Sequence, residues 1–183
     1  MYKLLTLNSL AAILSLTFLT HVTTPLAETH NKNRVIANAW ELPPVILNDL
    51  DGDKHNLYEW HGQVIMLNFW ATWCGPCQIE IPEFILYQAR YADQGLQIIG
   101  IGLDEPRKLK NYVRTVGINY PVLQADPESQ YSLLKQWGNP LGVLPFTVVV
   151  GKDGHLVFMQ QGIFDQESFK AIVIPLLKSS SSK

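Results

Sequence analysis

Two cysteines, the only ones in the chain, lie three positions apart in the segment Cys74-Gly75-Pro76-Cys77. A short apolar stretch typical of a β-strand, residues 64–67, comes just before them, and a helical pattern follows. Cys74 at a helix start would lie beside unpaired backbone N–H groups and the positive end of the helix dipole, which stabilise a thiolate. Cys77 would follow one turn later, at a Cα–Cα separation of about 5–6 Å that allows a disulfide. The spacing therefore favours a reactive thiol pair.

Two other uses of such a pair remain open at this point. A Cys-x-x-Cys segment can supply half of a zinc site, but zinc takes four ligands, and the histidines form no His-x-x-x-His pair: they are His21, His30, His55, His61 and His155. A purely structural disulfide that closes so short a loop would constrain the unfolded chain little. We expect redox chemistry at the pair, with no metal and no other cofactor.

A longer string around the cysteines, Asn-Phe-Trp-Ala-Thr-Trp-Cys-Gly-Pro-Cys at residues 68–77, is followed by Glu80 and Pro82. This string resembles the active site of the thioredoxin superfamily, and more narrowly that of its TlpA/ResA-like branch of extracytoplasmic thiol-disulfide oxidoreductases. The resemblance covers about residues 40–178. It implies an α/β thioredoxin fold with a mixed central sheet, helices on both faces and an N-terminal β-hairpin extension.

The order of local patterns predicts the same architecture. An extended apolar piece, then Asp51-Gly52 and residues 54–57, predicts the N-terminal hairpin. Pro82 should kink the first helix, and Pro175 should end or bend the last, which Asp165 can cap. The expected strands are 64–69, 96–103, 120–123, 146–150 and 155–160, and the expected helices are 75–91, 107–116, 126–137 and 166–177.

The N-terminus predicts export. Lys3 precedes a run without formal charge up to residue 26, which is typical of a signal peptide with cleavage after Ala27. The apolar stretch 4–19 can instead be retained as a membrane anchor, although polar residues interrupt it. In either case the catalytic domain would lie outside the cytoplasm, in the periplasm or at the outer face of the membrane. The expected divisions are 1–27 signal or anchor, 28–38 linker, 39–178 thioredoxin-like domain and 179–183 polar tail.

The formal net charge of −2 gives no argument for nucleic acid as a partner. We expect a monomer that acts on disulfides of other proteins.

The chemistry follows from the order of the two thiols. A Cys74 thiolate would attack a partner disulfide, and Cys77 would resolve the mixed disulfide that results. Trp73 would offer an apolar surface for partner docking, while Gly75 and Pro76 set the helix start and influence the redox potential. The same reaction run backwards would oxidise a partner, so this chemistry leaves the direction open.

Three further positions are assigned by the resemblance. Leu144-Pro145 resembles the cis-proline step of thioredoxins, which presents backbone to an extended substrate; the alternative is an ordinary trans proline. Glu80 resembles a glutamate that lies near the cysteines in ResA-like proteins, where a carboxylate would raise the thiol pKa and relay a proton; the alternative is a solvated helix residue. Asn68 replaces the buried aspartate of cytoplasmic thioredoxins and would satisfy backbone groups.

Together these features predict an exported thiol-disulfide oxidoreductase that reduces disulfides of envelope proteins. The resemblance alone implies apocytochrome c as a substrate class and a membrane thiol-transfer protein as electron donor. The alternatives are a disulfide oxidase or isomerase, a thiol peroxidase, and a non-enzymatic binding module on a thioredoxin scaffold.

Overall fold

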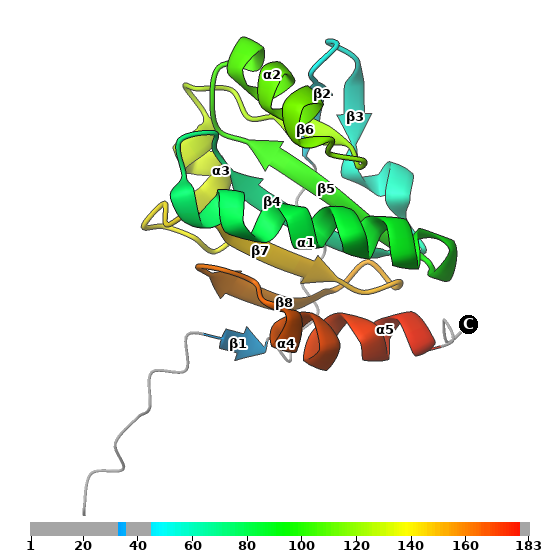
Figure 1. Ribbon diagram of the computed structural model, residues 1–183. Helices are drawn as coiled ribbons and strands as arrows, with labels where there is room; N and C mark the ends of the chain where they lie inside the picture. Colours follow the sequence, from blue (N-terminus) through cyan, green and yellow to red (C-terminus); the bar gives the residue numbers. More distant parts are fainter. Residues whose placement is uncertain (1–32, 36–44, 180–183) are drawn as a thin grey trace, which may run out of the picture. The chain divides into compact units, whose positions relative to one another are not determined.

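The computed structural model describes residues 33–35 and 45–179, which form one mixed eight-stranded sheet (Figure 1). The strand order is β1-β8-β7-β4-β5-β6-β2-β3. The central strand β4 pairs in parallel with β5 and antiparallel with β7, so the mixed sheet is confirmed. The strands are β1 (Asn33–Val35), β2 (Ile46–Asp49), β3 (Lys54–Asn56), β4 (Val64–Trp70), β5 (Leu96–Gly102), β6 (Val122–Gln124), β7 (Phe146–Val150) and β8 (Leu156–Gln161).

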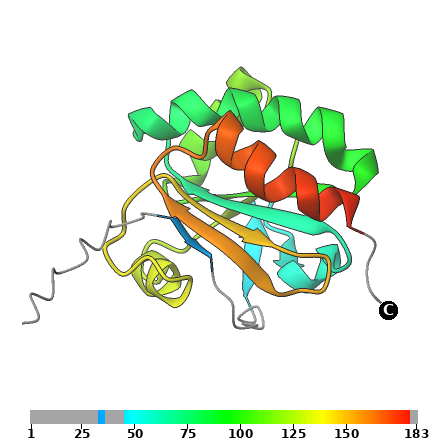
Figure 2. The ribbon, with the colours of Figure 1, turned by 90° about the horizontal axis from the view of Figure 1, so that it is seen from below.

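Helices cover both faces of the sheet, as predicted. All seven residues of β4 are buried, because its near-continuous apolar run packs on both sides. Figure 2 shows α1 and the α4–α5 segment over one face and α3 over the other. Residues of α2 pack on the same face as α1. The helices are α1 (Gly75–Tyr91), α2 (Pro106–Val116), α3 (Gln130–Gln136), α4 (Gln166–Ser168) and α5 (Ile174–Lys178), with short 3₁₀ helices at Leu57–Trp60 and Ala92–Gln94.

The N-terminal hairpin is present and extends the sheet. β2 pairs antiparallel with β3 and also with β6. The carboxylate of Asp49 holds the turn by accepting hydrogen bonds from the backbone N–H groups of Asp51 and Asp53, each at 2.9 Å. On the opposite edge, β1 pairs with β8. This strand lies within the segment expected to be a linker, so that expectation was wrong for residues 33–35.

Two helices differ from the sequence prediction at their ends. α3 begins at Gln130 rather than at Asp126, because the Asp126 carbonyl accepts hydrogen bonds from the N–H groups of Ser129 and Gln130 and so closes a turn ahead of the helix. Asp165 caps the last helix as expected, accepting from Ser168 N at 2.8 Å. A π-helical turn, Phe169–Val173, then connects α4 to α5.

Pro175 does not end this last segment. It lies in the first turn of α5, directly after the π-helical turn in which Ile174 N–H donates to the Phe169 carbonyl. Pro82 lies inside α1, which continues to Tyr91 as predicted. The expected signal or anchor, residues 1–27, lies outside the described residues. Within the described ranges no helix is both long and apolar enough to cross a bilayer.

Candidate active site

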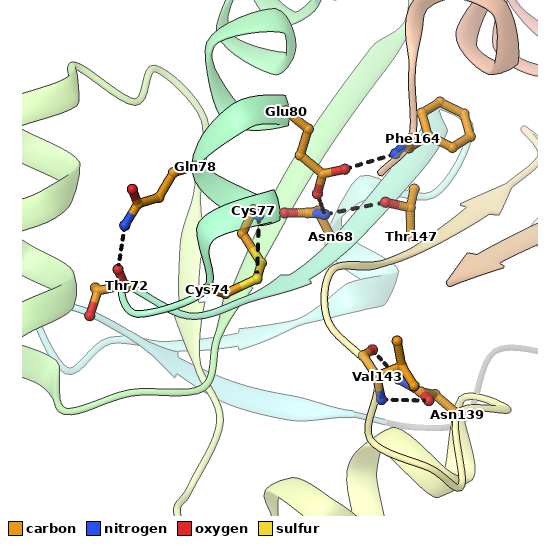
Figure 3. The surroundings of a disulfide bond; sticks show 10 residues. All are labelled: Asn68, Thr72, Cys74, Cys77, Gln78, Glu80, Asn139, Val143, Thr147 and Phe164. Carbon is orange, nitrogen blue, oxygen red and sulfur yellow. Dashed lines mark hydrogen bonds between the residues drawn. A yellow bond between two sulfur atoms is a disulfide. The ribbon is translucent and has the colours of Figure 1, made fainter. Parts of the chain in front are cut away.

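Cys74 and Cys77 form a disulfide at the N-terminus of α1, with their Cα atoms 5.3 Å apart (Figure 3). Cys74 is the N-cap residue, and its Sγ accepts a hydrogen bond from Cys77 N at 3.3 Å. Cys77 is fully buried, whereas 5% of Cys74 is exposed. An incoming thiol can therefore reach only Cys74. Among the described residues, no three His, Cys, Asp or Glu side chains gather as a metal site.

The loop between β4 and α1 is held by hydrogen bonds on both sides. Cys74 N donates to the Ala71 carbonyl at 3.1 Å, and the Gln78 side chain donates to the Thr72 carbonyl at 2.7 Å. The Thr72 hydroxyl donates to the carboxylate of Asp104, which follows β5. These contacts join the carboxyl ends of two parallel strands, and they fix the position of the first thiol.

Asp104 is a charged anchor of this loop. Burial alone would raise the pKa of its carboxyl group. The hydrogen bonds from Thr72 and from the backbone N–H of Glu105, together with the positive charge of Lys108, outweigh burial and lower that pKa below its ordinary value. Asp104 thus remains ionised at neutral pH.

The Leu144–Pro145 peptide bond is cis, as the resemblance implied. Asn139, which is fully buried, shapes the preceding loop (Figure 3): its side chain accepts from Val143 N at 3.1 Å and donates to the Val143 carbonyl at 2.8 Å. Gln161 at the end of β8 donates to the same side chain at 3.0 Å. The sequence analysis missed Asn139, whose only local signal is its place before Pro-Leu-Gly.

Glu80 lies in the interior, one turn after Cys77. Only 2% of it is exposed, so the solvated alternative is wrong. One carboxylate oxygen, Oε1, accepts from Asn68 Nδ2 at 2.6 Å, and the other, Oε2, accepts from the backbone N–H of Phe164 at 2.8 Å. Burial raises the pKa of Glu80 to about 7, although both hydrogen bonds oppose the shift. Glu80 can therefore both take and release a proton near neutral pH.

Asn68 contacts side chains rather than the backbone groups that the sequence suggested. Besides Glu80, its Nδ2 donates to Thr147 Oγ1 at 3.2 Å across the β4–β7 pair. Asn68 and Thr147 are both fully buried. Thr147 and Phe164 escaped the sequence analysis because they lie far along the chain from the cysteines.

Comparison with known proteins gives the same assignment. Residues 37–159 match the AhpC/TSA family. The thiol-disulfide oxidoreductase ResA of Geobacillus thermodenitrificans is 30% identical over 129 residues, which are 70% of this chain and 71% of that protein. The chain belongs to the AhpC/TSA family. It is a ResA-like thiol-disulfide oxidoreductase of the thioredoxin superfamily.

Solved structures of thiol-disulfide exchange proteins share this fold. A thioredoxin-family thiol:disulfide interchange protein from Chlorobium tepidum superposes with a TM-score of 0.67 at 28% identity, over 78% of this chain and 99% of that one. A secreted thiol-disulfide isomerase from Corynebacterium glutamicum superposes with a TM-score of 0.74 at 22% identity, over 84% of this chain and 96% of that one.

In this ResA-like chain, the apolar side chain of Trp73, next to Cys74 in the sequence, is exposed to solvent. Trp73 is 69% exposed, whereas Trp70 is fully buried in the core. Gly75 and Pro76 are exposed in the first turn of α1, while Leu144 is half-buried. The disulfide thus lies next to a surface that an apolar segment of a partner can cover.

Proposed function

We propose that this protein is an exported reductase of disulfides in envelope proteins. The buried carboxyl group of Glu80, with its pKa of about 7, carries this proposal. A negative charge near two thiols disfavours the thiolate. When the thiolate of the reduced form is not stabilised, the disulfide is a weaker oxidant and the dithiol is a stronger reductant. The Gly75-Pro76 pair between the cysteines supports the same direction.

The reduced enzyme would act in two steps. The Cys74 thiolate attacks one sulfur of the partner disulfide, that S–S bond breaks, and the departing partner sulfur takes a proton from water. Glu80 accepts the proton of the Cys77 thiol, and the Cys77 thiolate attacks Cys74 Sγ. The mixed disulfide breaks, and the second partner sulfur leaves with the proton that Glu80 accepted from Cys77. The partner gains two electrons from the two cysteines and two protons, one from water and one from Cys77, and the enzyme ends with the Cys74–Cys77 disulfide.

The partner would dock on the surface beside Cys74. Trp73 offers apolar area, and the cis Leu144–Pro145 segment offers backbone to an extended substrate. Apocytochrome c, whose haem-attachment cysteines must be reduced, is the substrate class that the resemblance implies. The electron donor would be a membrane thiol-transfer protein, and residues 1–27 would export or anchor the chain.

The reduction potential of the Cys74–Cys77 pair tests the direction. We expect a value near about −250 mV or lower, with a pH profile that changes in Glu80→Gln. A value above about −180 mV would overturn the reductase proposal in favour of an oxidase or isomerase. An unchanged profile in Glu80→Gln would remove Glu80 from the proton route.

Trapping of mixed disulfides tests the substrate. Cys77→Ser should retain partners on Cys74 from an envelope extract, and mass spectrometry should find haem-attachment peptides among them. Cys74→Ser is the matched control and should retain none. If Cys77→Ser retains no partner, the alternative of a non-enzymatic binding module is favoured. Rapid consumption of peroxide by the wild-type protein would favour the alternative of a thiol peroxidase.

A further inference from the structure

We propose that the side-chain amide of Asn68 reverses its orientation when Glu80 changes protonation state, which makes Asn68 a positioning residue for the proton transfer. The inference rests on the proposed role of Glu80 in the redox cycle. Asn68 lies on β4 directly beneath the first turns of α1, between Glu80 and Thr147 (Figure 3).

The observed orientation suits a charged Glu80. Asn68 Nδ2 carries two hydrogens, and both are used: one points to Glu80 Oε1 at 2.6 Å and one to Thr147 Oγ1 at 3.2 Å. The other amide atom, Oδ1, is buried and has no hydrogen-bond partner among the described residues. A buried acceptor without a donor is costly. In this orientation Asn68 Oδ1 is therefore an acceptor that remains available for a hydrogen bond.

The structure also favours one oxygen of Glu80 for the proton. Oε2 faces the backbone N–H of Phe164 at 2.8 Å, and an amide N–H can only donate. The proposal therefore places the proton on Oε1, which leaves Oε2 as the unprotonated acceptor for that N–H. There the new O–H would point at Asn68 Nδ2, and two donors would meet at 2.6 Å. Rotation of the amide by half a turn about its terminal bond, a torsion with two broad and nearly equivalent positions, brings Oδ1 to accept the O–H.

Thr147 allows this rotation without any other movement. Asn68 and Thr147 are registered partners on β4 and β7. A hydroxyl both donates and accepts, so Thr147 accepts from Nδ2 in one state and donates to Oδ1 in the other. The pair thereby offers Glu80 Oε1 a donor when Glu80 is charged and an acceptor when it is protonated.

Other titratable groups near Glu80 do not replace this mechanism. Cys74 and Cys77 lie on the same helix and titrate only when reduced. Tyr120 is buried and interacts electrostatically with Glu80. Its pKa is raised far above the ordinary value, first by burial and then by that negative charge, so its phenol stays neutral. Asn68 is the side chain that lies within hydrogen-bond distance of Oε1.

Nuclear magnetic resonance on the oxidised full-length protein tests the inference. The carboxyl carbon of Glu80 reports its titration, and the Asn68 side-chain N–H signals report the amide orientation. Above the Glu80 midpoint, we expect nuclear Overhauser contacts from the Asn68 N–H protons to Thr147 and Glu80. Below it these contacts should vanish with the same midpoint. Contacts that persist unchanged through the Glu80 titration would overturn the inference.

Glu80→Gln provides a second, pH-independent test. Phe164 N–H must still find an acceptor, so the new side-chain amide would turn its NH2 group toward Asn68, which can accept only through Oδ1. We expect this variant to show the low-pH pattern of Asn68 at every pH, while Glu83→Gln, an exposed change on the same helix, behaves as wild type. A wild-type high-pH pattern in Glu80→Gln would refute the reversal.

Asn68→Leu tests positioning. It removes a donor to the charged form of Glu80, and we expect the Glu80 midpoint to rise by about one pH unit or more. The pH at which the reduction potential changes slope should rise with it; an unmoved midpoint would contradict the role of Asn68. If the reduction potential does not depend on Glu80 but the Asn68 amide still reverses, the proposed function is wrong and the reversal still holds.

Discussion

Two carboxyl groups flank the loop that carries Cys74, and their pKa values shift in opposite directions. Asp104 follows β5 and is partly buried, whereas Glu80 lies on α1 and is buried, with 2% of the residue exposed. The pKa of Asp104 is lowered, whereas that of Glu80 is raised to about 7. The deeper burial of Glu80, which raises its pKa, is the first part of the difference.

The partners of the two groups account for the second part of the difference. Asp104 accepts from the Thr72 hydroxyl and from Glu105 N at 2.8 Å, and Lys108 Nζ lies 3.6 Å from its Oδ1. Glu80 accepts from two neutral donors, and in the part of the chain that the structure describes it forms no ion pair. Two donors and a nearby cation in a partly buried site keep Asp104 ionised as an anchor, whereas deep burial without a cation leaves Glu80 free to titrate near neutral pH.

The largest expected effect separates the two groups by activity. Glu80→Gln should slow the reduction of a protein disulfide by a factor on the order of 100 at neutral pH, because a positioned proton carrier is lost. Asp104→Asn should leave the rate within a factor of about three, since Asp104 donates no proton to the reaction. Single-turnover kinetics with the reduced enzyme measures both. Equal losses of rate in the two variants would show that Glu80 and Asp104 do not differ as proton carrier and structural anchor.

The second expected effect is a pH dependence of stability with opposite signs. Glu80 binds a proton more tightly in the native state than in the unfolded chain, because its pKa rises from 4.5 to about 7. Native stability should therefore fall as pH rises across that window, by about 3 kcal/mol. Asp104, with its lowered pKa, contributes stability above its ordinary value of 3.8 that is lost as pH falls below it.

Urea unfolding of the oxidised protein between about pH 4.5 and 7 checks the first of these slopes. The fall should be present in wild type and in Asp104→Asn, and absent in Glu80→Gln. A flat wild-type profile would mean that Glu80 titrates at its ordinary pKa.

The sequence predicted the parts of this comparison that depend on local pattern. The cysteine spacing, the strand before it and the span of α1 all lie in one continuous stretch, and each was confirmed. Hydrophobicity alone would place Ile79 on the packed face of α1, yet Ile79 is 66% exposed and the neighbouring Glu80 is buried. Here tertiary structure overrides hydrophobicity.

Distant residues account for what the sequence could not show. The burial of Glu80 depends on Asn68, twelve positions earlier, and on the backbone of Phe164, 84 positions later. Asp104 is anchored to Thr72 across 32 positions. Such contacts follow from sheet order and loop placement, which no local periodicity contains.

A smaller expected effect concerns the stability of the anchor. Asp104→Asn should lower the free energy of unfolding at neutral pH by about 1–2 kcal/mol, because hydrogen bonds to a charged acceptor are replaced by weaker neutral ones. Asp93→Asn, an exposed change outside the site, is the control and should have no measurable effect. Urea denaturation gives both values, and equal stability of wild type and Asp104→Asn would show that the Thr72 contact contributes nothing to the fold.

The smallest expected effect asks whether charge or hydrogen bonding holds Asp104 ionised. Lys108 is half exposed and divides its ammonium group between Asp104 and Glu105. Solvent and salt screen such a charge, whereas the donors Thr72 and Glu105 N act at contact distance. Lys108→Gln should therefore raise the pKa of the Asp104 carboxyl only slightly, which its carbon resonance would report, and activity should be unchanged. A return of that pKa to its ordinary value would assign the contrast with Glu80 to the cation, and it would predict that a cation placed beside Glu80 converts the proton carrier into a second anchor.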